Sequence, residues 1–81
     1  MTWNNRVIRT TYTDKFGTDF TFAIHEVYYN ERGEITHWTE RAVIPSGDSF
    51  TELYVDLRRY VFALNLPVLE ERDGTLVAIT D

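Results

Sequence analysis

One amphipathic helix, bounded by sequence signals at both of its ends, is the feature that most constrains how this chain can fold. Ser49 and Glu52 stand in the order of a capping box, in which the serine hydroxyl accepts a backbone amide and the glutamate reaches back. Pro67 forbids continuation of the helix, and Asn65 can adopt the left-handed conformation that ends helices. The sequence therefore predicts a helix over residues 50–64. Its apolar residues at helical spacing are Phe50, Leu53, Tyr54, Leu57, Val61 and Leu64, with Val55 and Phe62 widening the stripe.

The segments on both sides of this helix have β character. Residues 5–13 are rich in β-branched side chains, and residues 20–29 alternate between apolar and other side chains. A third strand is expected to follow the turn at residues 30–33 and to end before Pro45. After the helix, residues 68–70 and 75–80 flank Asp-Gly, a strong hairpin turn.

These segments predict one α+β domain over residues 1–81. Its order is β-β-β-α-β(-β), an antiparallel sheet of three to five strands with the amphipathic helix packed on one face, because this arrangement buries both apolar surfaces. The sequence leaves open whether the last hairpin joins the main sheet or extends outward.

Two registers are open for the second and third strands. A three-residue loop with Gly33 left-handed pairs Asn30 with Glu34, and Tyr28 then faces Thr36. A two-residue loop slips the pairing by one and swaps the faces of the third strand. The first register is preferred because it stacks the apolar ends of the strands together.

His25 and His37 are the only histidines and the first candidates for chemistry. In the preferred register both lie on one sheet face as diagonal neighbours, which could begin a metal site or supply a general base. A third ligand is missing, because Glu26 and Glu40 fall on the opposite face. In the slipped register His25 faces Glu40 and is separated from His37. A polar cross-strand pair is the favoured interpretation, and no cofactor is predicted.

Glu26 interrupts an otherwise apolar face. A carboxylate there lies at the rim of the sheet, pairs with Arg6 or Arg41, or is buried alone with a raised pKa. Rim placement is favoured, because carboxylates are rarely buried without a partner.

Composition and charge exclude several classes of protein. The chain has no cysteine, which excludes a disulfide scaffold and a thiolate metal site and favours the cytoplasm. Its start lacks the apolar stretch of a signal peptide, and no apolar run approaches the length of a membrane span. The net charge is −5, and residues 48–81 hold seven acids and three bases, so direct nucleic-acid binding is not expected. No phosphate-binding loop or catalytic triad is recognisable.

The other sheet face is also partly apolar, which indicates a partner. It carries Val27, Tyr29, Ile35 and Val43. With aromatic and acidic neighbours, the candidate binding surface comprises Val27, Tyr29, Ile35, His37, Trp38, Glu70, Glu71 and Asp73.

Four segments of the sequence resemble those of a group of short bacterial proteins of unknown function. They are Trp-Asn-Asn-Arg-Val-Ile at residues 3–8, Ile-His-Glu-Val-Tyr-Tyr-Asn at 24–30, Pro-Ser-Gly-Asp-Ser-Phe-Thr-Glu-Leu at 45–53 and Pro-Val-Leu at 67–69. More distantly, three strands followed by Gly-Asp-Ser and a helix resemble the N-terminal domain of HicB-type antitoxins, although the Pro-Asp-Leu-Pro-Gly-Cys stretch of that family is absent. This second resemblance implies a domain that binds and neutralises a ribonuclease toxin.

The sequence thus favours a small non-enzymatic protein-binding module of bacterial or phage origin, either antitoxin-like or a counter-defence inhibitor. Its expected partner is a nuclease or another protein that handles nucleic acid. A metal-dependent or acid-base site around His25, His37 and a carboxylate is the alternative. A homodimer, formed through edge strands or the second apolar face, is compatible with the binding function.

Overall fold

The computed structural model describes residues 2–79 as a five-stranded sheet with one helix. The elements are β1 (Thr2–Asp14), β2 (Gly17–Tyr29), β3 (Ile35–Trp38), α1 (Phe50–Ala63), β4 (Leu69–Arg72) and β5 (Thr75–Ala78). Their order in the sheet is β3-β2-β1-β4-β5. The predicted α+β class and element order are confirmed. Thr80, the last residue of the predicted final strand, lies outside the described residues.

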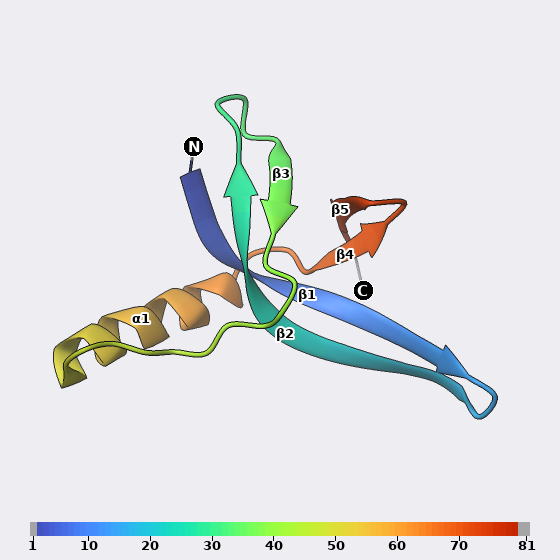
Figure 1. Cartoon of the computed structure of the whole chain (residues 1–81), viewed down its shortest axis with the longest axis horizontal. Coiled ribbons are helices and arrows are strands. Elements are labelled where there is room, and N and C mark those ends of the chain that lie inside the picture. Colours follow the sequence, from blue (N-terminus) through green and yellow to red (C-terminus); the bar gives the residue numbers. More distant parts are fainter. Residues whose placement is uncertain (1, 80–81) are drawn as a thin grey trace.

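The sheet is mixed, which corrects the expectation of a purely antiparallel sheet. β4 pairs parallel to β1 through Ile8–Leu69 and Arg9–Glu70, so the last hairpin joins the main sheet (Figure 1). The reason is the crossover through α1. A helix between two strands lets the second strand run parallel to the strand before the helix, which is β3 here. β3 and β1 both run antiparallel to β2, so a strand parallel to β3 is also parallel to β1.

The main core lies inside the curl of this sheet. Ile8, Val27, Leu69 and Leu76 are buried there. Tyr29, Ile35 and Trp38 pack against them and are partly buried. The face that the sequence assigned to a partner is therefore largely the core of the chain itself, because the curling sheet brings the β4–β5 hairpin over it. Val27 has no exposed surface and no partner can contact it, which corrects its place in the candidate binding surface and in the candidate dimer face.

A β-bulge accounts for the register of β2 and β3. Gly33 is left-handed, the Asn30 amide donates to the Glu34 carbonyl, and Tyr29 pairs with Ile35, as in the preferred register. The register then shifts by one residue, so that Tyr28 pairs with His37 and Val27 with Trp38, as in the slipped register. β3 also ends at Trp38, earlier than expected.

The predicted start of the helix is confirmed, and its predicted end is confirmed to one residue. The Ser49 hydroxyl accepts the Glu52 amide at 3.1 Å, and a carboxylate oxygen of Glu52 accepts the Asp48 amide at 2.7 Å. Asn65 does not adopt the left-handed conformation. In the described chain, Asp73 is the only non-glycine residue with positive φ. Instead, the helix tightens at its end, where the Leu64, Asn65 and Leu66 amides donate to carbonyls three residues back.

Candidate interaction surface

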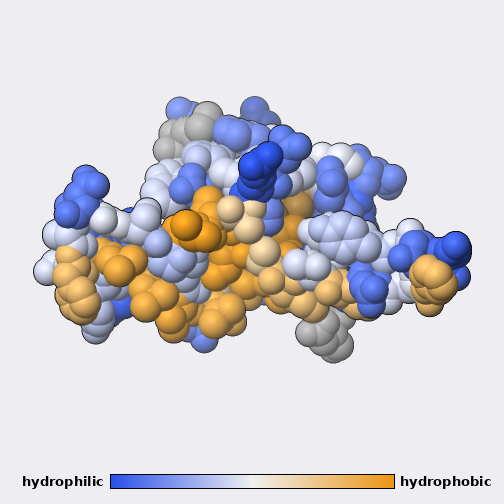
Figure 2. All heavy atoms as spheres, turned by 60° about the horizontal axis from the view of Figure 1, so that its bottom comes forward, coloured by the Kyte–Doolittle hydropathy of each residue, from blue (hydrophilic) through white to orange (hydrophobic). Residues whose placement is uncertain are grey.

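The apolar stripe of α1 faces solvent. We call this set of residues the outer stripe: Phe50, Leu53, Tyr54, Leu57, Val61 and Leu64. Their side chains are between 39% and 84% exposed. Figure 2 shows hydrophobic residues gathered over the helix and continuing across the centre of the molecule. The expectation that the stripe packs on the sheet is therefore wrong.

A different side of α1 meets the sheet. Tyr60 and Ala63 are its buried residues, and Asp56 beside them is largely covered. At 3.6 residues per turn, this side lies roughly 100° around the helix from the centre of the outer stripe. The loop over residues 39–48 helps to fix that rotation, because the Ser46 amide donates to the Asp56 carboxylate at 2.9 Å. Tyr60, Ala63 and Asp56 thus occupy the position that the apolar stripe was expected to take.

The β1–β2 hairpin projects from the sheet on the other side of the molecule (Figure 1). Residues 10–22 are all exposed, and we call this segment the arm. Its exposed aromatic side chains are Tyr12, Phe16, Phe20 and Phe22. β4 pairs with β1 only through Ile8 and Arg9, so both edges of the arm are free of further strands in the described chain.

Phe20 and Phe22 lie on the same face of the arm, and Tyr12 lies on the other face because it pairs with Asp19. The guanidinium of Arg9 stands over the Phe20 ring at 4.6 Å from its centroid. Sequence reasoning missed the arm because its alternating pattern is also that of a strand covered on one face. One signal was present: Phe16 sits at the turn before Gly17, where a side chain projects into water.

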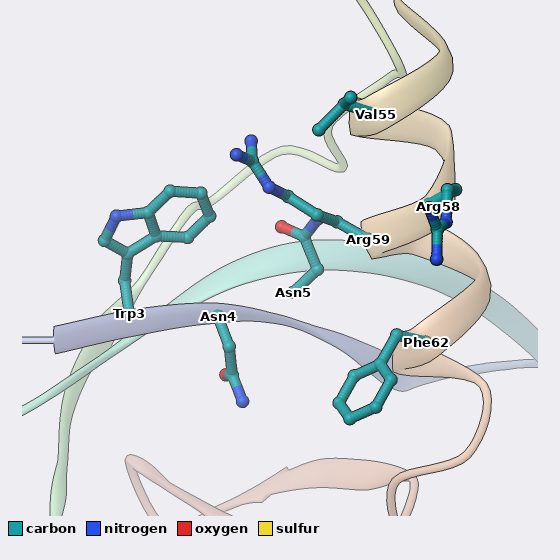
Figure 3. Close-up of a pocket in the computed structure, with 7 residues that line it drawn as sticks. All are labelled: Trp3, Asn4, Asn5, Val55, Arg58, Arg59 and Phe62. Atoms are coloured by element: carbon teal, nitrogen blue, oxygen red, sulfur yellow. The ribbon is translucent and has the colours of Figure 1, made fainter. Parts of the chain in front are cut away.

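An open groove of about 460 Å³ separates the start of β1 from α1. Figure 3 shows Trp3 on one side of it and Val55, Arg58 and Phe62 on the other. Trp3 was not among the predicted site residues. At this end the groove lies between the two elements, so α1 leaves this part of β1 uncovered.

The bulge places the two histidines on opposite faces of the sheet, so the predicted His25–His37 pair does not form. His37 stacks on Tyr28 with ring centroids 4.4 Å apart. His25 is buried on the inner face, where its Nδ1 lies 2.8 Å from the Thr39 carbonyl oxygen. Because a carbonyl only accepts, Nδ1 carries the proton of this hydrogen bond.

His25 lines a recess of about 500 Å³ together with Trp38, Glu40, Glu70 and Glu71. The curled sheet thus brings together residues from β3 and β4, which are not neighbours in the sheet. Within residues 2–79, however, no three histidine, aspartate or glutamate side chains are grouped closely enough to hold a metal ion.

Glu26 is neither paired with Arg6 nor with Arg41. Its carboxylate accepts the Tyr28 hydroxyl at 2.6 Å on the face that α1 partly covers. This hydrogen bond to a carboxylate raises the pKa of Tyr28 above its usual value, because it favours the protonated phenol. The pKa of Tyr60 is also raised, by burial first and then by the charges of Asp56 and Glu26.

Two of the predicted binding residues are engaged within the chain. The Tyr29 hydroxyl donates to Asn4 at 2.7 Å and accepts from Arg6 at 3.0 Å. Glu70 joins β4 to β1, because it accepts hydrogen bonds from Arg9 and Thr11 of β1, both at 3.1 Å. It also accepts one from Arg72 within β4 at 3.0 Å. These hydrogen bonds, led by that from Arg72, lower the pKa of Glu70. Ile35 and Trp38 are half-buried, whereas His37, Glu71 and Asp73 remain exposed.

Glu70→Gln is expected to reduce the stability of the protein at neutral pH and to flatten its pH dependence in acid. The folded-state pKa of Glu70 is lowered, so its ionised form stabilises the fold above the unfolded pKa. That contribution is lost as the pH falls from the ordinary pKa of glutamate to the lowered pKa of Glu70 in the folded state. Urea unfolding between pH 7 and pH 3 measures the effect.

Glu71→Gln is the matched control, because Glu71 is the next residue along β4 and its side chain is exposed. It should keep the pH dependence of the wild type. If Glu70→Gln loses as much stability between pH 7 and pH 3 as the wild type does, Glu70 is not the ionic link between β4 and β1.

In the part of the chain that the structure describes, no helix combines the length and the apolar character needed to cross a membrane. No family model matches the chain, and no curated protein or solved structure matches it significantly.

Proposed function

We propose that this chain is a non-enzymatic protein-binding module that occupies and inhibits a partner protein, and that the arm makes the contact. The observation that carries the proposal is the exposed arm with Phe20 and Phe22 side by side on one face.

The arm has the physical character of a binding element. An isolated two-stranded hairpin is marginally stable in water, and it is stabilised when a further surface covers one of its faces. Aromatic side chains bury large apolar area with little loss of rotamer freedom, and they are enriched among the residues that dominate binding energy. Phe20 and Phe22 are both more than half exposed, because no other element of the described chain covers them.

Charge favours a partner with a basic surface. The chain has a net charge of −5, and its C-terminal part keeps Glu71 and Asp73 exposed. Opposite charge steers association and accelerates it at low salt. Proteins that handle nucleic acid present basic surfaces. A nuclease or related protein, inhibited as an antitoxin or a counter-defence protein would inhibit it, is therefore the partner that we propose.

The double variant Phe20→Thr/Phe22→Thr tests this function. Threonine retains strand propensity, so the arm keeps its conformation while it loses both rings. Loss of an aromatic anchor typically weakens binding by about 30-fold or more. The tagged chain should capture one stoichiometric partner from host lysate at moderate salt, and the double variant should lose it. Binding to the purified partner is then measured by calorimetry.

Tyr12→Thr is the matched control, because it removes an exposed aromatic ring from the opposite face of the same arm. It should retain the partner. If no partner is captured, or if the double variant binds its partner as tightly as the wild type does, the proposed role of the arm is wrong.

A further inference from the structure

We propose that a second copy of this chain covers the outer stripe, with the two α1 helices packed antiparallel about a two-fold axis beside Leu57. This inference goes beyond the proposed function and does not depend on the partner of the arm.

Five residues of the outer stripe, all but Tyr54, are spaced symmetrically about Leu57. Leu53 and Val61 each lie four residues from it, and Phe50 and Leu64 each lie seven residues from it. An interface related by a two-fold axis brings a patch against itself, so in antiparallel helices each residue meets the one that lies equally far on the other side of the axis. Apolar residues at equal distances from Leu57 therefore meet apolar residues. The axis places Leu57 against its copy, Leu53 against the partner's Val61 and Phe50 against the partner's Leu64.

No charged side chain interrupts this patch. The charged residues of α1 are Glu52, Asp56, Arg58 and Arg59, and at 3.6 residues per turn they lie beside or behind the stripe. Antiparallel packing also sets the positive N-terminal end of each helix dipole near the negative C-terminal end of the other helix.

The chain exposes enough area to supply a dimer interface. The folded chain exposes 6354 Å², whereas a compact monomer of this mass exposes about 5,100 Å². Its radius of gyration is 14.1 Å, against about 12 Å for a compact chain of this length. The excess of about 1,250 Å² is enough to supply the roughly 800 Å² that each protomer contributes to a standard interface and to leave the arm exposed.

The thin core is the reason to assign the stripe to a second copy rather than to a foreign protein. The buried apolar residues of the described chain are Val7, Ile8, Val27, Tyr60, Ala63, Leu69 and Leu76. Chains of this size with so small a core often gain the missing stability by oligomerisation. A second copy is present whenever the chain is synthesised, so self-association covers the stripe without any other protein.

Sedimentation of the full chain at micromolar concentration tests the proposal first. The wild type should sediment as a dimer, and Leu57→Asp should weaken the dimer by about 100-fold or more, because each copy places a charge in the centre of an apolar patch. The arm variant Phe20→Thr/Phe22→Thr should remain dimeric, which separates this inference from the proposed function.

Disulfide formation provides a second test that does not require a destabilising charge. The chain contains no cysteine, so a single introduced cysteine can pair only between copies. Helix axes 8–10 Å apart bring facing Cα atoms to about 3.5–5.5 Å, a range that overlaps the roughly 4.4–6.8 Å that disulfides span. Under mild oxidation, Leu57→Cys should convert most chains to a linked dimer. Thr51→Cys, exposed on another side of α1, should not.

A mixture of Leu53→Cys and Val61→Cys chains reports the orientation of the helices. Antiparallel packing links the two variants to each other, whereas neither variant alone should form a linked dimer efficiently. The proposal is overturned if the wild type sediments as a monomer, if Leu57→Cys links no better than Thr51→Cys, or if Leu53→Cys alone links as well as the mixture does.

Discussion

Leu69→Ala is expected to lower the free energy of unfolding by about 2–4 kcal/mol. Leu69 is 3% exposed, pairs with Ile8 across the parallel contact and lies in the cluster with Val27 and Leu76. Its side chain therefore connects the β4–β5 hairpin to the centre of the sheet. Truncation removes apolar area from the core and leaves a cavity that the neighbouring core side chains fill only in part.

Urea unfolding, followed by circular dichroism at one fixed protein concentration, measures this loss. The concentration is fixed because dimerisation adds a concentration-dependent term to the apparent stability. Ile44→Ala is the control, because Ile44 is a branched aliphatic residue that is 77% exposed and lies outside the outer stripe. Its cost should stay within about 0.5 kcal/mol. Equal losses in the two variants would contradict the placement of the main core inside the curl.

Local signals in the sequence predicted the local structure well. The Ser49–Glu52 capping box starts α1 where expected, and the left-handed Gly33 closes the turn between β2 and β3. Asp73 and Gly74 both have positive φ, as the hairpin turn of an Asp-Gly pair requires. Each of these features depends on a few consecutive residues whose conformational preferences are strong.

The errors concern contacts between distant parts of the chain. The period of the α1 pattern identifies an apolar side, but it does not say whether that side meets the same chain or another one. The parallel pairing of β4 rests on Ile8 and Leu69, which are far apart in the sequence. One extra residue in the bulge moved His37 to the other face, and no propensity scale registers a single inserted residue.

Gly47→Ala is expected to destabilise the protein by about 1–3 kcal/mol, because the loop before α1 has no room for a methyl group. A Cβ atom at Gly47 would lie 2.5 Å from the Leu53 amide nitrogen and 2.7 Å from the Glu52 carbonyl carbon. These neighbours are backbone atoms of the first helical turn, so no side-chain rotation relieves the clash. Either the loop or the start of α1 has to move.

That movement should reach the dimer as well. The same loop holds the rotation of α1 through the Ser46 amide and Asp56, and a shift there turns the outer stripe away from its two-fold arrangement. Gly47→Ala should therefore unfold at lower urea and also dissociate at higher protein concentration than the wild type. Ser46→Ala is the control, since it keeps the amide and adds no atom beside the helix. If Gly47→Ala costs no more than Ser46→Ala in both measurements, the loop does not set the position of the helix.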